Sequence, residues 1–193
     1  LAGKPWLVET NSQYGLLSHA ALTGIFAALG SVSYEGFSVI NQVSYLLYYL
    51  GLYLLLRLWL RSQAAALIGL GVLLAGTYWL QLSPTITAYD YPGLSPWRFG
   101  LYIPAAIAWL IYAQRGARDR AGRLARELCL LVAGLAPLWN IDSGLYLAAA
   151  VATTMAVDAV AWGKGKLTAR ITSAAARLIR LSGYTAAGLL AIS

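Results

Sequence analysis

The sequence predicts an all-α fold: a polytopic transmembrane helical bundle with one interfacial juxtamembrane helix. Of its 193 residues, 60% are hydrophobic and only 11% are charged, whereas about 25% of the residues in an ordinary soluble domain are charged. The mean hydropathy is +0.65. Lys and Arg gather in short clusters between apolar runs, as orientation signals do in membrane proteins. The net charge of +7 is therefore explained by membrane topology, and we expect no nucleic-acid partner.

The opening segment, residues 9–15, is polar, carries a carboxylate and stands directly before the long apolar part of the sequence. Residues 16–30 are apolar but interrupted by polar side chains, and a helix of about 15 residues rises only about 23 Å, less than the hydrocarbon core of roughly 30 Å. This segment either crosses the membrane or lies in the interface, and we favour the interface. The sequence thus predicts an external loop and juxtamembrane helix over residues 1–37 and a transmembrane helical domain over residues 38–193, together a part of a longer chain.

The remaining apolar runs predict about five to six membrane spans. The clearest covers residues 38–60, which are free of charge until Arg57. Residues 83–98 carry three prolines, which forbid a regular helix, so this segment is predicted to be a loop. Further helices are predicted over residues 64–82, 99–113, 127–139 and 145–162, with a last one beginning at residue 182.

Orientation follows from the basic clusters at residues 57–61, 115–126 and 164–180. If the helices alternate sides and these clusters are cytoplasmic, residues 83–98 and 140–144 are external. With residues 16–30 in the interface, the opening segment is external too. Ionisable groups at a membrane are costly unless they are used or paired, so those on the external face form a candidate site. They are Glu9, Glu35, Asp90, Arg98 and Asp142.

Three short motifs resemble those of a known family. Residues 3–9 (GKPWLVE), followed by Tyr14-Gly15 and a short apolar helix, resemble the first external loop of GT-C fold glycosyltransferases. Residues 95–98 (SPWR) and 138–144 (LWNIDSG) resemble loop motifs of bacterial members of that group. The resemblance covers most of the chain as an order of features. The chain departs from the family in having Leu16 where proline is common and Glu9 where aspartate is more usual, and it lacks the family's first transmembrane helix.

The resemblance implies that a sugar moves from a polyprenyl-phosphate donor to an acceptor hydroxyl, on the external side of the cytoplasmic (inner) membrane in the cell envelope. Glu9 would be the catalytic general base, unless the catalytic acid lies in a segment before this chain. Arg98, with Lys4 as a lesser candidate, would stabilise the departing phosphate. Asp142 and Asn140 would hydrogen-bond sugar or acceptor hydroxyls.

Tyr14 and Trp139 would stack on a sugar ring. The donor is a lipid-linked substrate, so no cofactor is required. His19 has no second histidine or cysteine at ligand spacing, so no metal site is expected. Asp158 is expected to pair with a lysine such as Lys164.

Other functions stay open. The chain could be a non-catalytic membrane subunit that packs against other membrane subunits in a larger complex. A lipid or solute transporter ranks behind it, because the sequence shows no convincing internal repeat. The site residues also have ordinary alternatives: Glu9 and Asp142 could favour a helix start, and Arg98 could anchor a helix end to lipid phosphate.

Overall fold

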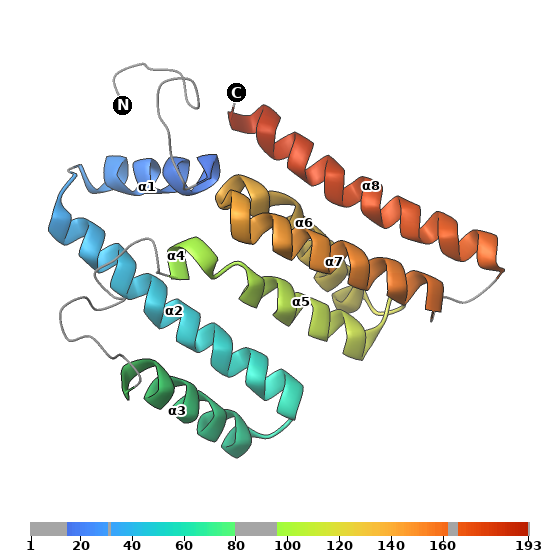
Figure 1. Cartoon of the computed structure of the whole chain (residues 1–193), viewed down its shortest axis with the longest axis horizontal. Coiled ribbons are helices and arrows are strands. Elements are labelled where there is room, and N and C mark those ends of the chain that lie inside the picture. Colours follow the sequence, from blue (N-terminus) through green and yellow to red (C-terminus); the bar gives the residue numbers. More distant parts are fainter. Residues whose placement is uncertain (1–14, 31, 80–95, 162–165, 193) are drawn as a thin grey trace. The chain divides into compact units, whose positions relative to one another are not determined.

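The computed structural model describes residues 15–30, 32–79, 96–161 and 166–192, and all regular structure in these ranges is α-helical (Figure 1). The predicted all-α class is therefore confirmed for the described part of the chain. In order, the helices are α1 (Leu16–Leu29), α2 (Tyr34–Leu60), α3 (Gln63–Trp79), α4 (Pro96–Phe99), α5 (Tyr102–Arg115), α6 (Arg120–Trp139), α7 (Ile141–Ala161) and α8 (Leu167–Ile192).

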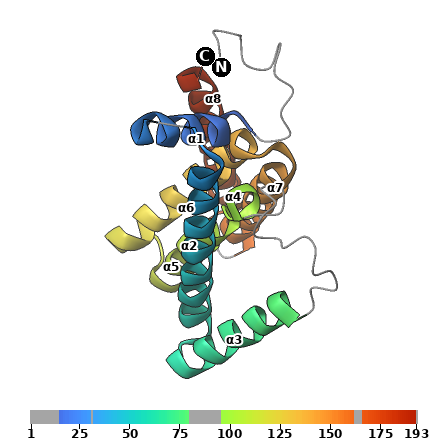
Figure 2. The ribbon, with the colours of Figure 1, turned by 90° about the vertical axis from the view of Figure 1, so that its left-hand side faces the viewer.

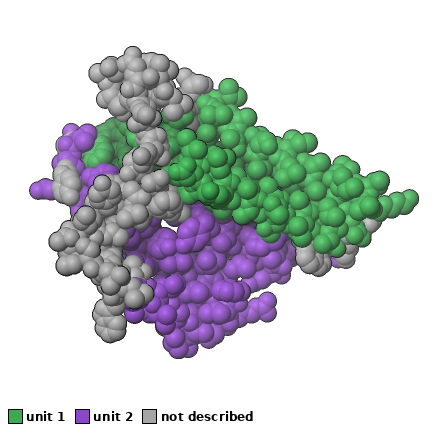
Figure 3. Space-filling model, in the orientation of Figure 1, with its two compact units in different colours: residues 1–28, 130–193 green, residues 29–129 purple. Residues whose placement is uncertain are grey.

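The chain forms two compact units (Figure 3). Unit 1 combines residues 1–28 with residues 130–193, and unit 2 holds residues 29–129. In unit 1, α7 packs along α8. In unit 2, α2 contacts α3, α4 and α5, and α3 turns away from the end of α2 (Figure 2).

The longest helix, α2, has a defined cap at each end. Ser33 is extended, and its side chain accepts a hydrogen bond from the Gly36 amide, which satisfies one of the free N–H groups of the first turn. At the other end Arg61 adopts the left-handed conformation, with φ 54°, and its amide donates to the Arg57 carbonyl. The helix thus begins four residues before the predicted start at residue 38 and ends where expected.

Close helix contact in unit 2 depends on a glycine. A Cβ atom at Gly51 of α2 would lie 2.7 Å from the Cγ2 atom of Ile103 in α5. Near this contact the hydroxyl groups of Tyr48 and Tyr102 lie 2.7 Å apart and share a hydrogen bond. Small residues allow two helices to approach closely both in water and in membranes.

In unit 1, polar contacts join α8 to its neighbours. The Thr185 hydroxyl donates to the Gly134 carbonyl of α6 at 2.6 Å. Arg177 donates to Asp158 of α7 at 2.7 Å. The structure therefore gives Asp158 an arginine partner, whereas the sequence suggested a lysine such as Lys164, which lies outside the described residues.

Two larger differences from the prediction concern α6 and α8. The sequence placed the start of one helix at residue 127, but α6 begins at Arg120, so it includes residues 120–126, seven of the twelve in the basic run 115–126. Arginine is a good helix former, and a cluster of positive charge does not by itself break a helix. The sequence also separated the basic cluster at residues 164–180 from a last helix that begins at residue 182. The structure has a single helix, α8, across both.

Two helices of the described chain are long and apolar enough to cross a membrane, Glu35–Leu60 and Ile141–Ala161. Their most apolar windows are only 6% and 17% buried inside the structure, which differs from the mostly buried core helix of a soluble protein. Leu16–Leu29 and Gln63–Gly76 are apolar but shorter. The polytopic bundle of five to six spans is therefore not confirmed, because only these two helices of the described residues are both long and apolar enough.

Candidate functional site

The candidate site lies in unit 1, where α1 begins and α6 meets α7. The Gly15 amide donates a hydrogen bond to the Trp139 carbonyl at 2.9 Å. Gly15 is buried, and a Cβ atom there would overlap the carbonyl groups of Leu138 and Trp139. Only glycine allows two backbones to approach so closely. Gly15 and residues 138–139, which are far apart in the sequence, are thus in direct contact.

The first turn of α1 is held by polar side chains that converge on one carbonyl. The buried Ser18 hydroxyl donates to the Gly15 carbonyl at 2.8 Å. His19 Nδ1 lies 3.2 Å from the same oxygen. His19 therefore lies beside the candidate site. Among the described residues no three His, Cys, Asp or Glu side chains are grouped so that they could hold a metal ion.

Asn140 is the single residue between α6 and α7, and it caps α7. Its side-chain oxygen accepts hydrogen bonds from the Ser143 amide at 3.0 Å and from the Ser143 hydroxyl at 2.9 Å. Only 1% of Asn140 is exposed, and its Nδ2 atom is buried with no hydrogen-bond partner among the described residues. Asn140 thus orders the helix start, and its amide nitrogen keeps a donor for a further acceptor.

Asp142 lies in the first turn of α7 and is exposed. A carboxylate is favoured there by the N–H groups at the helix N-terminus. The turn before it is tight, because a Cβ atom at Gly144 would overlap the Ala136 carbonyl of α6. This packing fixes the direction in which α7 leaves the junction. Chemically, Asp142 offers an anionic acceptor for hydroxyl groups at the exposed start of α7.

The structure brings some of the predicted site residues together. Asn140 and Asp142 share the α6–α7 junction, and Gly15, the residue that follows Tyr14, is hydrogen-bonded to it. Lys4, Glu9 and Tyr14 themselves lie outside the described residues, as does Asp90. Arg98 lies in α4 of unit 2, and its side chain is outside the described part of the chain.

Sequence reasoning missed two residues of this site, Ser143 and Ser18. The Ser143 hydroxyl donates to the side-chain oxygen of Asn140, three residues earlier. The Ser18 hydroxyl donates to the carbonyl of Gly15, also three residues earlier. The Asn-x-x-Ser spacing before an apolar run is a helix-start signal that could have identified Ser143. The long-range contact between Gly15 and Trp139 has no comparable local signal.

Comparison of the chain with protein-family models, with curated proteins and with solved structures finds no match.

Proposed function

We propose that this chain belongs to a membrane glycosyltransferase that moves a sugar from a polyprenyl-phosphate donor to an acceptor hydroxyl, at a site on the external face of the cytoplasmic membrane. The observation that carries the proposal is the hydrogen bond from Gly15 to Trp139. It joins Gly15, which follows Tyr14 in the sequence, to the junction that bears Asn140 and Asp142. Gly15 and residues 138–144 belong to two of the three motifs in which the chain resembles GT-C enzymes.

The proposed chemistry is a displacement at the anomeric carbon. Glu9 accepts the proton of the acceptor hydroxyl, and the oxygen of that hydroxyl forms a bond to the anomeric carbon. The bond from the carbon to the phosphate oxygen breaks, and the polyprenyl phosphate leaves with the electron pair. Arg98, with Lys4, stabilises the negative charge that develops on the phosphate. Asp142 and the Asn140 amide orient sugar or acceptor hydroxyls, and Tyr14 supplies a ring on which a sugar can stack.

The membrane placement is supported by the surface of α2. Large apolar side chains are exposed along most of this helix, including Val39, Leu46, Leu50 and Leu54. Such a continuous exposed apolar surface is unusual in water and marks contact with lipid or another protein. Lipid contact is favoured by the length and hydropathy of Glu35–Leu60.

A non-catalytic membrane subunit is the second candidate. It is favoured by α8, on which Ile179 and Leu190 are 71% and 77% exposed. These side chains could pack against helices of a partner protein instead of lipid. In that case the α6–α7 junction would be only a structural turn.

A sugar-transfer assay on the full-length protein in native membranes separates the two candidates. Glu9→Gln should lower the transfer rate by about 10²–10⁴-fold, because the amide cannot accept the proton. Asp142→Asn should mainly raise the KM for the acceptor, because hydrogen bonding is weakened while the base remains. Asp119→Asn, the same change in an exposed carboxylate of unit 2, is the matched control and should leave transfer unchanged.

Expression and gel-filtration profiles of all variants are compared with wild type. If wild type transfers sugar and Glu9→Gln is equally active, Glu9 is not the base. If wild type is inert with every polyprenyl-linked donor, the subunit function replaces the enzyme.

A further inference from the structure

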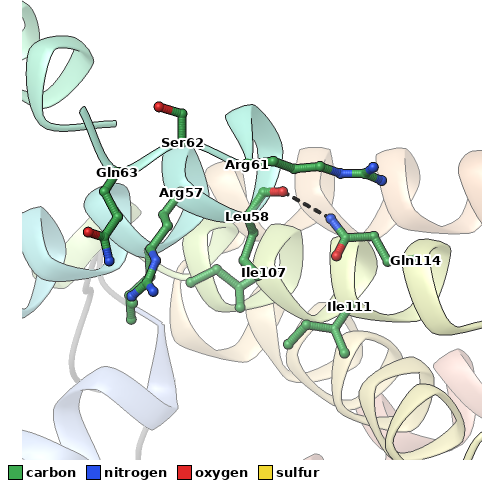
Figure 4. Close-up of a pocket in the computed structure, with 9 residues that line it drawn as sticks. Arg57, Leu58, Arg61, Ser62, Gln63, Ile107, Ile111 and Gln114 are labelled. Atoms are coloured by element: carbon green, nitrogen blue, oxygen red, sulfur yellow. Dashed lines mark hydrogen bonds between the residues drawn. The ribbon is translucent and has the colours of Figure 1, made fainter. Parts of the chain in front are cut away.

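A pocket of about 620 Å³ lies in unit 2 at the C-terminal end of α2 (Figure 4). It is formed by the last turns of α2, the short turn into α3, and one side of α5. Its apolar wall includes Leu54, Ile107 and Ile111, and its polar groups include Arg57, Arg61 and Gln114. The pocket therefore combines a mostly apolar wall with two positive charges.

A hydrogen bond between helices holds the pocket in shape. Gln114 Nε2 of α5 donates to the Leu58 carbonyl at 2.9 Å (Figure 4). This carbonyl is one of the last four of α2, which have no partner within the helix. The contact thus fixes the end of α5 against the end of α2, and it does so without using either arginine.

The two arginines reach different parts of the pocket. They stand four residues apart, which would place them on one helix face if α2 continued. Instead Arg61 has left the helix, with φ 54°, and Figure 4 shows its side chain extending away from that of Arg57. An extended ligand could therefore meet both guanidinium groups, whereas a small ion at one point would meet one.

The charge of this pocket is uncompensated among the described residues. Both arginines are exposed, no acidic side chain lines the pocket, and neither arginine forms an ion pair or a side-chain hydrogen bond within the described part of the chain. By contrast, Arg115 of the same unit is paired with Asp119. The pocket is therefore suited to an anion.

The position of the pocket relative to the membrane indicates which kind of anion it binds. The apolar segment Glu35–Leu60 has 26 residues and rises about 39 Å as a helix, more than the hydrocarbon core of roughly 30 Å. Its last turns therefore reach the headgroup layer. Anionic lipids of the cytoplasmic leaflet attract Lys and Arg at that depth.

We propose that this pocket binds an anionic phospholipid. The phosphate and headgroup lie against Arg57 and Arg61, and an acyl chain lies along Leu54, Ile107 and Ile111. A free phosphate ion shares the charge but would leave the apolar wall unfilled. Lipid binding here requires α2 to lie in a membrane but does not require sugar transfer, so either proposal can fail without the other.

The test measures lipid affinity of the full chain in detergent micelles by native mass spectrometry. Phosphatidylglycerol, phosphatidylcholine and inorganic phosphate are titrated separately. We expect the double variant Arg57→Gln/Arg61→Gln to weaken phosphatidylglycerol binding by about tenfold or more. Arg118→Gln, an exposed arginine outside the pocket, is the matched control and should change the Kd by less than about twofold.

A second variant tests the apolar wall. Ile107→Trp fills the pocket and should weaken binding of phosphatidylglycerol while leaving any phosphate binding unchanged. The proposal is overturned if the two lipids bind equally well, or if Arg118→Gln has the same effect as the double variant. It is also overturned if inorganic phosphate binds as tightly as phosphatidylglycerol, which would make this a free-anion site.

Discussion

The ion pair between α7 and α8 allows a quantitative test of how unit 1 is held together. Arg177 Nη1 lies 2.7 Å from Asp158 Oδ2 and also donates to the Met155 carbonyl at 3.1 Å. The two charged side chains are 13% and 28% exposed. Asp158→Asn removes the negative charge, keeps the side-chain shape, and leaves Arg177 mostly buried without its anionic partner.

The expected cost follows from this burial. Removing one partner of a fully buried pair costs about 3–5 kcal/mol, because the other charge stays desolvated. Water reaches part of the Asp158 carboxylate, so we expect Asp158→Asn to lower the free energy of unfolding by about 2–3 kcal/mol. Adding Arg177→Met removes the guanidinium charge as well, so the double variant should cost less than the sum of the single ones, with a coupling energy of about 1–3 kcal/mol.

Equilibrium unfolding in mixed detergent micelles measures this coupling. It compares wild type, Asp158→Asn, Arg177→Met and the double variant. The control is the pair Arg115–Asp119, which has the same residue types at 3.1 Å but is 59% and 42% exposed. Exposed pairs contribute little because water and salt screen them. A coupling in the α7–α8 pair no larger than that in the control pair would refute the link between burial and stability drawn here.

Two further predictions concern unit 2. The hydrogen bond from Arg115 lowers the pKa of Asp119, so the carboxylate's stabilisation is present above the ordinary aspartate pKa of about 4 and is lost as the pH falls through the lowered value. The difference in thermal midpoint between wild type and Asp119→Asn should therefore shrink below about pH 4, and a difference that grows there would contradict this. Gly51→Ala places a Cβ atom 2.7 Å from Ile103. We expect it to destabilise the protein by about 1–2 kcal/mol, because the cost of overpacking is larger than the gain in helix propensity from glycine to alanine. Gly71→Ala, where nothing lies within 4 Å, is the control in the same unfolding assay and should be neutral or stabilising; equal effects would rule out overpacking at Gly51.

The helices that could be predicted best are those whose residues are almost all apolar. The run predicted at residues 38–60 corresponds to α2, and the run at 145–162 to α7, with starts four residues late in each case. Both starts were missed because the capping residues Ser33 and Asn140 stand outside the apolar run. The N-terminal part of α6 was missed for a different reason: its arginines were interpreted as an orientation signal between two spans, although arginine favours a helix.

The candidate site could be predicted only in part. A helix start was predicted only as the ordinary alternative for Asp142, and the structure places Asp142 in the first turn of α7. Asn140 was predicted only to bind hydroxyl groups, and its capping of α7 was not predicted. That Gly15 would contact Trp139 could not be read from the sequence, because the contact depends on backbone packing between distant segments. The roles of Lys4, Glu9 and Tyr14 stay predictions.

At position 61 the left-handed backbone conformation and the proposed lipid contact favour different residues. The backbone would be more relaxed with glycine, since a side chain at φ 54° is strained. The proposed lipid contact instead needs a guanidinium group at this turn. A screen that selects only for thermal stability would therefore favour glycine at position 61 and, in the same step, discard half of the positive charge that lines the pocket.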